Sequence, residues 1–538
     1  MSPALPMGFF DMLYYLCAIW ILTKLIKVGM ARWRGGVQTT PLQGPPNQSL
    51  MFGLYRYVND SEDSAMVYEN WATQYGPAFK IPLGLGSSKI IICDPKANAH
   101  FYAKETFGYV QTKLARVFIE NLFGRGLLWA EGESHRRQRK ALSPAFSNAA
   151  IRRLTSVFYD SAYKMKDNWD AVLDSNSGDA MIDVQKWMNH VSLDSVGIAG
   201  FGHDFGSLDG KYPPVVEVFE TIGSSDKSFL SQFVFLMGPV LPTLQNLPTS
   251  DNRLFKRLRE TMSEIADELL TRTRKEREGK GTGEKAEEKS IIGQLIKAES
   301  TNTELQMSQE EVLAQMNVLL LAGYETTSIS LTWALIELAR KPEKQEKLRR
   351  ELDPFSGTDP TWEQLASGLP YLDAVVHEIL RLHAPVSETT RVASEDDVIP
   401  FTMPITTSTG ETVTSLTVAK GTIVSSPIRA MNRSEVFWGP NAKEFEPERW
   451  LEPTELRSKE ISGHRNLLTF SDGPRICLGK QFALSEFKSV LSVLIRNYTF
   501  ELPDGPTTKI ERHKGILPRP KVAGQVGAKT PMKIRRVE

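Results

Sequence analysis

Cysteine is scarce in this sequence. Cys17, Cys93 and Cys477 are its only cysteines, and their spacing matches neither a disulfide framework nor a zinc site. An excess of one charge is also absent, because Lys plus Arg and Asp plus Glu both total 64. We therefore expect no nucleic-acid partner, and the low cysteine content fits a reducing environment that faces the cytosol.

A dinucleotide-binding fingerprint is missing as well. Gly197, Gly200 and Gly202 lie close together, but their spacing is not G-x-G-x-x-G and no βαβ pattern surrounds them. We also find no internal repeat. The chain is therefore predicted to bind no nicotinamide cofactor itself.

One long apolar run stands near the N-terminus, from Met7 to Leu25. About twenty apolar residues span a bilayer as a helix, so this run is just long enough. Basic residues follow it and none precede it, which places the rest of the chain on the cytosolic side: Lys24, Lys27, Arg32 and Arg34. A cleaved signal peptide is the alternative, but it requires a basic segment before the apolar run.

The pattern changes along the remainder of the chain. Pro41 to Pro46 predicts a stiff linker, and β-type runs at 78–82 and 89–93 predict a small sheet. The middle, from Pro95 to about Arg381, is mostly helical in pattern, with a charged stretch at 274–289 that predicts a loop. Strand-like runs return at 413–418 and 422–425 and near the C-terminus.

The stretch Phe470-Ser-Asp-Gly-Pro-Arg-Ile-Cys-Leu-Gly479 sets Cys477 in a special environment. Gly473 and the proline after it favour a tight turn, and Gly479 leaves room for a large group near the backbone. The helical run that follows puts Cys477 at a helix N-terminus, where a thiol's pKa is lowered and a thiolate metal ligand is favoured. A buried, inert cysteine is the alternative.

These ten residues match F-x-x-G-x-R-x-C-x-G at every fixed position, and the stretch resembles the haem-binding loop of the cytochrome P-450 family. The resemblance extends from about residue 40 to the end. It implies haem b as cofactor, Cys477 as the axial ligand of the iron, and Phe470, Gly473, Arg475 and Gly479 as haem contacts. The implied fold is mainly α with a smaller β-rich part, preceded by one N-terminal transmembrane helix. The expected division is an anchor and basic flank (1–35), a proline-containing linker (36–50) and a haem-binding catalytic domain (51–538).

Ser308-Gln-Glu-Glu311 has the spacing of a capping box and predicts the start of a long apolar helix that ends near Arg340. Inside it lies Ala322-Gly-Tyr-Glu-Thr-Thr327. A mid-helix glycine costs about 1 kcal/mol, and a carboxylate in an apolar helix is costly unless paired. The segment resembles the family's oxygen-activation motif, which implies that Thr326 hydrogen-bonds activated oxygen and Glu325 relays protons. A buried ion pair at Glu325 is the structural alternative.

Four further positions match residues that contact the haem propionates in the family. Arg139 lies on the basic helical segment 132–140, and Arg391 and Arg475 match two more arginines. His135 stands where the family usually has tryptophan. A histidine can still donate to a carboxylate, but its role then depends on pH.

Glu378-Ile-Leu-Arg381 and the Arg449 of Phe445-Glu-Pro-Glu-Arg-Trp450 resemble the family's locked carboxylate–guanidinium network. Alone, an i,i+3 Glu–Arg pair would be worth only about 0.2–0.5 kcal/mol. A bidentate network of this kind suits a rigid scaffold.

The resemblance implies a haem-thiolate monooxygenase that uses O2 and electrons from NADPH through NADPH-cytochrome P-450 reductase, with cytochrome b5 as an optional second donor. It places the enzyme in the endoplasmic reticulum membrane, crossing it once, with the catalytic domain facing the cytosol. By position, the substrate pocket is expected to be lined by 107–128, 229–241, 320–321, 386–389 and 516–517. These segments are largely apolar and favour a lipophilic substrate such as a fungal terpenoid. A fatty-acid or xenobiotic hydroxylase, a haem-thiolate isomerase or dehydratase, and a non-catalytic haem protein are the alternatives.

Overall fold

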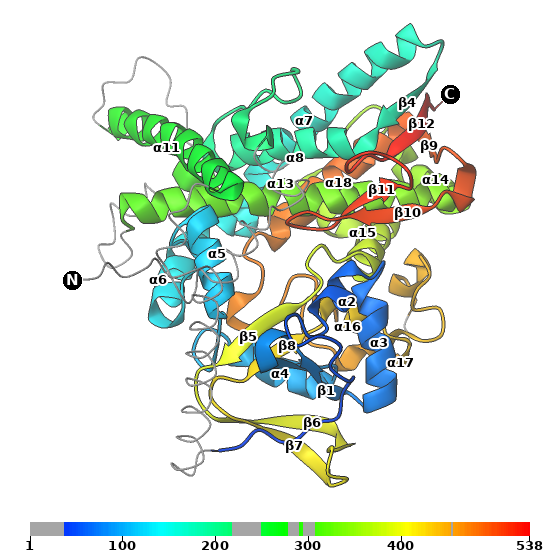
Figure 1. Ribbon diagram of the computed structural model, residues 1–538. Coiled ribbons are helices and arrows are strands. Elements are labelled where there is room, and N and C mark those ends of the chain that lie inside the picture. The colour runs from blue at the N-terminus through cyan, green and yellow to red at the C-terminus, as the bar shows by residue number, and fades with distance from the viewer. Residues whose placement is uncertain (1–36, 218–248, 278–289, 294–306, 453–455, 538) are drawn as a thin grey trace, which may run out of the picture.

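The computed structural model describes residues 37–217, 249–277, 290–293, 307–452 and 456–537 (Figure 1). The predicted transmembrane helix at 7–25 lies outside these residues. The described helices are α2 (Tyr55–Asp60), α3 (Ser64–Tyr75), α4 (Pro95–Ala103), α5 (Lys113–Phe123), α6 (Gly132–Leu142), α7 (Asn148–Ser175), α8 (Val184–Phe201), α11 (Ser250–Arg277), α13 (Gln309–Arg340), α14 (Pro342–Leu352), α15 (Pro370–Leu382), α16 (Ile428–Arg433), α17 (Glu435–Trp438) and α18 (Lys480–Asn497).

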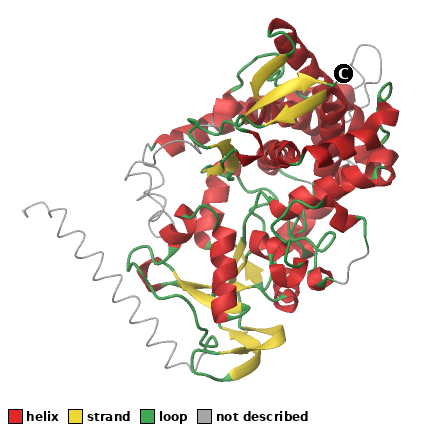
Figure 2. Ribbon diagram, turned by 90° about the vertical axis from the view of Figure 1, so that its right-hand side faces the viewer, coloured by secondary structure: helices red, strands yellow, loops and turns green. Residues whose placement is uncertain are grey.

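The described strands form four sheets around the helical body (Figure 2). Their bounds are β1 (Ala78–Pro82), β2 (Ser88–Ile92), β3 (Tyr109–Val110), β4 (Asp179–Asp183), β5 (Thr389–Ala393), β6 (Asp397–Thr406), β7 (Thr412–Val418), β8 (Ile423–Ser426), β9 (Tyr498–Glu501), β10 (Ile510–His513), β11 (Arg519–Val522) and β12 (Pro531–Arg536). One sheet has the order β1-β2-β8-β5-β3, another has the order β4-β12-β9, and β6–β7 and β10–β11 are pairs. The mainly helical fold with a smaller β-rich part is thus confirmed.

The five-stranded sheet joins segments that are far apart in the chain. β2 pairs with β8 in parallel, with Lys89 opposite Ile423, and β8 pairs with β5 antiparallel, with Arg391 opposite Val424. The strands expected at 78–82, 89–93, 413–418 and 422–425 are all present, within one or two residues. This sheet brings Arg391 to the residues that follow α4, which matters for the site described below.

The proline-containing stretch before α2 runs along the sheets. Thr40 donates its N–H to Thr417 O at 3.0 Å, and Gln43 O accepts from Lys80 N at 2.8 Å. Leu42 is buried in the main hydrophobic core. These residues are therefore packed against β1 and β7.

Helix α13 runs through the middle of the molecule (Figure 1). Ser308 caps it, with the reciprocal hydrogen bonds to Glu311 that the capping-box spacing predicted, and it ends at Arg340 as expected. Among the described residues it is the one helix whose length and composition would allow it to cross a membrane, but most of its side chains are buried by the surrounding protein. It is therefore the central helix of the core.

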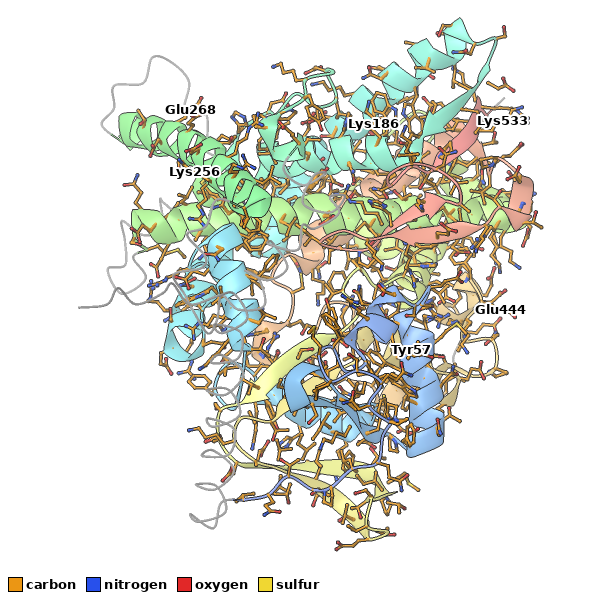
Figure 3. The ribbon with its side chains drawn as sticks, in the orientation of Figure 1. Tyr57, Lys186, Lys256, Glu268, Glu444 and Lys533 are labelled. Carbon is orange, nitrogen blue, oxygen red and sulfur yellow. The ribbon has the colours of Figure 1, made fainter. Side chains whose placement is uncertain are left out.

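Helix α11 lies on the outside and is amphipathic. Phe255, Leu258, Met262 and Ile265 are buried at helical spacing, while exposed charged side chains such as Lys256 and Glu268 lie on the other side (Figure 3). The helix continues to Arg277, so the loop predicted to begin at Arg274 is wrong for 274–277, and the rest of that predicted loop lies outside the described residues.

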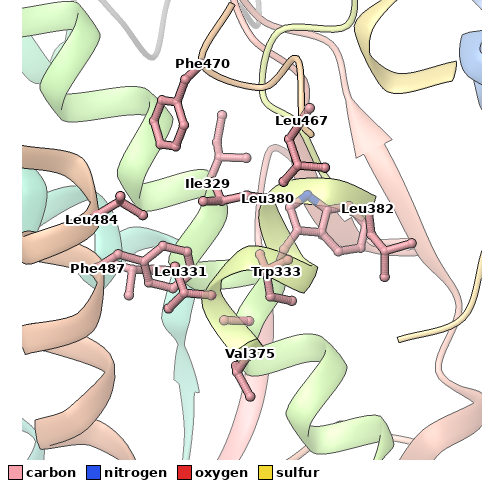
Figure 4. Close-up of a cluster of buried hydrophobic side chains, with 14 of the residues drawn as sticks. Ile329, Leu331, Trp333, Val375, Leu380, Leu382, Leu467, Phe470, Leu484 and Phe487 are labelled. Carbon is pink, nitrogen blue, oxygen red and sulfur yellow. The ribbon is translucent and has the colours of Figure 1, made fainter. Parts of the chain in front are cut away.

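The largest core cluster ties the Cys477 loop to the helices. Figure 4 shows Phe470 beside Ile329 of α13, and Leu484 and Phe487 of α18 on the same side of the cluster. Leu467 packs nearby against Leu380 of α15. The loop before Cys477 is thereby anchored on buried apolar contacts from three helices.

Candidate functional site

The loop that carries Cys477 has the conformation its glycines predict. Gly473 adopts φ 61°, and a Cβ there would lie 2.3 Å from Tyr102 O, so only glycine fits. A Cβ at Gly479 would lie 3.8 Å from the Phe146 ring, an ordinary van der Waals contact, so space alone does not require glycine at this position. Cys477 donates its N–H to Phe470 O at 2.7 Å and so closes the loop.

The Cys477 thiol is accessible, yet it lies deep in the protein. Its side chain is exposed, whereas burial by the surrounding atoms raises the pKa of its thiol. The Gly479 N–H and the charges of Arg139 and Lys480 oppose that rise without overcoming it, so the predicted lowering of the pKa is wrong for the protein alone. A sulfur that is both surrounded and accessible faces an internal space, and coordination to a metal would remove its proton.

One face of α13 lines an accessible space as well. Val318 and Thr326 are partly exposed and Ala322 is exposed, at i, i+4 and i+8, although most of their neighbours on the helix are buried. Leu478, directly after Cys477, packs in the same hydrophobic cluster as Val318 and Leu321. The small side chain of Ala322 and the hydroxyl of Thr326 therefore both lie on an accessible face of α13.

Glu325 and Gly323 both have packing partners. The carboxylate of Glu325 is buried and paired with Arg519 of β11, with Oε1 3.0 Å from Nε. A Cβ at Gly323 would lie 2.6 Å from the Val196 side chain, so glycine lets α13 approach α8 closely. The ion pair that the sequence left as an alternative is present. Oε2 of Glu325 has no hydrogen-bond partner among the described residues, and burial raises the pKa of the carboxyl, so a relay role stays a prediction.

Three arginines and a histidine converge beside the cysteine loop. His135 of α6 is buried, and burial together with the charges of Arg475, Arg139 and Arg391 lowers its pKa to about 4. His135 is therefore neutral at neutral pH and can donate one N–H to an anion, and the pH dependence expected for it falls in the acid range. Arg475 Nε is buried without a hydrogen-bond partner among the described residues. A cluster of this charge is suited to an anionic ligand.

Two carboxylates that the sequence did not point to lie in this cluster. Glu131 Oε2 is 2.6 Å from Arg475 Nη2, and Glu105 Oε1 is 2.8 Å from Arg391 Nε. Neither belongs to a motif, because each meets its arginine only through the folding of distant segments. We name the six residues His135, Arg139, Arg391, Arg475, Glu105 and Glu131 the cationic cradle.

The Glu378 network forms a buried scaffold, as predicted. Glu378 Oε1 accepts from Arg381 Nη2 at 2.8 Å and from Arg449 Nε at 3.1 Å, and both Glu378 and Arg381 are completely buried. Trp450, which departs from the family's usual phenylalanine, donates its indole N–H to Glu378 Oε2 at 3.0 Å. That hydrogen bond adds a partner which a phenylalanine could not supply.

The segments expected to line a substrate pocket are accessible in part. Leu128 and Val386 are clearly exposed, and Phe118, Ile516 and Leu517 are partly buried. The segment expected around 229–241 lies outside the described residues. These side chains are apolar, which suits a lipophilic molecule.

The residues together fit an iron porphyrin with two carboxylates. Cys477 offers an accessible sulfur, the cationic cradle offers guanidinium donors, and Ala322 leaves open space on α13. A porphyrin is flat and apolar, so it suits the accessible face of α13 at Ala322 and the apolar side chain of Leu478. Cys477 would ligate the iron, and Arg139, Arg391, Arg475 and His135 would bind the propionates.

Comparisons with known proteins agree with this fit. The family model "Cytochrome P450" matches residues 42–526. Cytochrome P450 monooxygenase claP of Ampulloclitocybe clavipes is 65% identical over the full length of both chains. Cytochrome P450 monooxygenase 205 of Postia placenta is 35% identical, covering 93% of this chain and 94% of its own. Ganoderic acid synthetase CYP5150L8 of Ganoderma lucidum is 32% identical, covering 86% and 88%.

Proposed function

This chain belongs to the cytochrome P450 family of haem-thiolate monooxygenases, and from that premise we propose that its substrate is a lipophilic small molecule of fungal secondary metabolism, such as a terpenoid. The observation that supports this most is the accessible apolar lining beside Ala322 and Thr326. Similarity to ganoderic acid synthetase supports it as well. The product would be an alcohol, or an aldehyde or acid after further turnover.

Haem, when bound, supplies the oxygen chemistry, because its thiolate ligand favours O–O cleavage. The chain supplies position and protons. Cys477 would present the sulfur, the buried cluster around Phe470 anchors its loop, and the cationic cradle would bind the propionates. Glu325 can hold a proton on Oε2, since Arg519 contacts only Oε1, and Thr326 can pass a proton through its hydroxyl.

Electrons are proposed to come from NADPH through NADPH-cytochrome P-450 reductase, with cytochrome b5 as an optional second donor. We also propose attachment to the endoplasmic reticulum membrane by the segment at 7–25. The lack of a G-x-G-x-x-G motif supports a separate reductase. Both proposals are supported by the family resemblance and by sequence patterns alone.

Co-expression with a reductase tests the proposed reaction. Membranes fed with terpenoids, sterols, fatty acids and aromatic xenobiotics should yield, by mass spectrometry, an oxygenated terpenoid that requires NADPH and reductase. A reductase-free preparation is the control. Product formed equally in that control would indicate an isomerase or dehydratase, and product from fatty acids alone would replace the terpenoid with that substrate class.

Replacing Thr326 with alanine should uncouple NADPH consumption from product formation. A hydrogen bond worth about 1.4 kcal/mol corresponds to about tenfold in rate, so product per NADPH should fall by about that factor. Thr326 makes an i−4 bond to Ala322 O at 2.6 Å, so helix α13 should persist without the hydroxyl. The measurement is product against NADPH consumed, with peroxide as the diverted product.

Thr332→Ala is the matched control for this prediction. Thr332 makes the same i−4 bond, to Ser328 O at 2.8 Å, but it is fully buried and cannot reach the accessible face. Its coupling ratio should equal that of the unaltered protein. Equal coupling in Thr326→Ala would contradict the proposed proton transfer.

A further inference from the structure

Glu105 is a buried carboxylate inside the cationic cradle. It follows α4, its side chain has no exposed surface, and its Oε1 lies 2.8 Å from Arg391 Nε. Arg475 also acts on it, and Glu131 opposes both arginines. Glu105 is therefore close to three other charges of the cofactor site, although it belongs to none of the family's motifs.

The environment of Glu105 suits an ionised carboxylate poorly. Neither oxygen of Glu105 accepts a well-directed hydrogen bond from any described residue. Arg391 Nε likewise donates no well-directed hydrogen bond to a described residue, although it lies close enough to Glu105 to form an ion pair. A buried ionised carboxylate normally needs both a partner charge and several hydrogen bonds. Burial raises the pKa of Glu105, and the nearby arginines offset that rise only in part. A modest change in the surrounding charge can therefore shift Glu105 between its ionised and protonated forms.

The backbone holds Glu105 in this position. Thr106, the next residue, adopts φ 75°, a conformation that β-branched residues rarely take. Its N–H donates to Tyr109 O at 2.9 Å, and its carbonyl accepts from Gly132 N at 3.0 Å, at the start of α6. These bonds tie the strained turn to the helix that carries His135 and so direct Glu105 inward.

The charges around Glu105 come from every element that packs against it. They are Arg391 on β5, Arg475 on the cysteine loop, Glu131 before α6, and His135 and Arg139 on α6, with Tyr102 of α4 beside them. Burial raises the pKa of Tyr102 to about 12, and His135 has a pKa of about 4, so both are neutral at neutral pH.

A charge count then separates the two forms of Glu105. With both carboxylates ionised, three guanidiniums leave the cationic cradle with one positive charge. With Glu105 protonated, the cationic cradle has a net charge of two positive units. This charge balances the two negative charges of the haem propionates. Reduction of the iron adds one negative charge near the cradle, and this favours the protonated form further.

We propose that Glu105 is the redox-linked proton acceptor of this haem site, a positioning residue that pairs with Arg391 when ionised and takes up a proton when the iron is reduced. With haem bound, one electron delivered to it would be accompanied by uptake of one proton: an O–H bond of a solvent hydronium ion would break and an O–H bond on the Glu105 carboxylate would form. The proposal rests on haem binding, and not on the proposed substrate or reductase.

Spectroelectrochemical titration of the haem-loaded protein over about pH 5 to about pH 9 tests this proposal, because the range covers raised carboxyl pKa values. Reduction takes up a proton where the pH lies between the pKa of Glu105 in the oxidised and in the reduced protein. The reduction potential of the haem should therefore fall as pH rises. At a fixed applied potential, the ratio of reduced to oxidised haem should fall by up to tenfold per pH unit, which corresponds to about 59 mV for one electron. Glu105→Gln should have a higher potential that no longer changes with pH.

Two further variants make the outcome decisive. Glu105→Asp keeps a titrating carboxyl and should keep the slope, and Glu120→Gln, which removes a partly exposed carboxylate paired with Arg125, should leave it unchanged. A potential that is independent of pH in the unaltered protein would overturn the proposal even if Glu105→Gln fails to load haem. A slope that persists in Glu105→Gln would assign the proton to another group and also overturn it. Because no substrate is present, the outcome is independent of the substrate proposal.

Discussion

Replacing Cys477 with alanine should abolish the characteristic spectrum of the reduced, carbon monoxide-bound haem and all monooxygenase activity. Among the described residues only Cys93 and Cys477 are cysteines, and only Cys477 has an exposed side chain. Alanine offers no metal ligand, and the electron donation that favours O–O cleavage would be lost with the sulfur. The loop itself should persist, because the Cys477 N–H to Phe470 O bond belongs to the backbone.

Cys93→Ala is the control for the thiolate assignment. Cys93 follows β2, and burial raises the pKa of its thiol to about 12, so it is a poor thiolate. This variant should give the same reduced carbon monoxide spectrum as the unaltered protein. An unchanged spectrum in Cys477→Ala would refute Cys477 as the ligand, and loss of the spectrum in both variants would point to a general folding defect.

Replacing Arg381 with leucine should unfold the protein or come close to it. The guanidinium is completely buried, forms two hydrogen bonds to Glu378 and donates to three backbone carbonyls, which are Asn432 O, Ala442 O and Glu444 O. Removing one partner of a buried pair leaves an uncompensated charge and costs about 3–5 kcal/mol. Since a whole domain is stable by only about 5–15 kcal/mol, we expect little soluble, haem-loaded protein and a strongly lowered Tm.

Arg457→Leu is a matched control, because Arg457 pairs with Glu460 at the same i,i+3 spacing but on the surface. Its Nε lies 2.9 Å from Glu460 Oε1, and both side chains are exposed, so the loss should cost about 0–1 kcal/mol. Thermal unfolding and haem content measure both variants. If Arg381→Leu were as stable as Arg457→Leu, the proposed scaffold role of the Glu378 network would be wrong.

Local sequence patterns predicted the local structure of this site well. The capping box at Ser308 gave the start of α13, and the residues around Cys477 gave a closed loop with a tight turn at Gly473. Such patterns succeed because a capping bond or a tight turn depends on residues only a few positions apart. The network of Glu378, Arg381 and Arg449 was predicted from the family resemblance and is present, although its i,i+3 spacing alone is a weak signal.

Contacts between distant segments could not be predicted in this way. Glu325 and Arg519 are 194 positions apart, and Val196 fills the space beside Gly323, so two residues that looked costly in the sequence have packing partners in the fold. No local pattern in the sequence indicates which distant residue such a side chain will contact. A glycine or a carboxylate inside an apolar helix therefore indicates that the position has a specific partner, but it does not identify that partner.

By itself, the sequence indicated the chemistry of this protein, a haem-containing monooxygenase of the cytochrome P450 family, and it predicts Cys477 as the thiolate ligand. The tertiary structure alone decided the charge around that haem. It placed Glu105 against Arg391 and Glu131 against Arg475, and it buried His135 in its neutral form. The physical reason is that ligand identity depends on a few adjacent residues, whereas an electrostatic environment is the sum of charges that only the folded chain brings together.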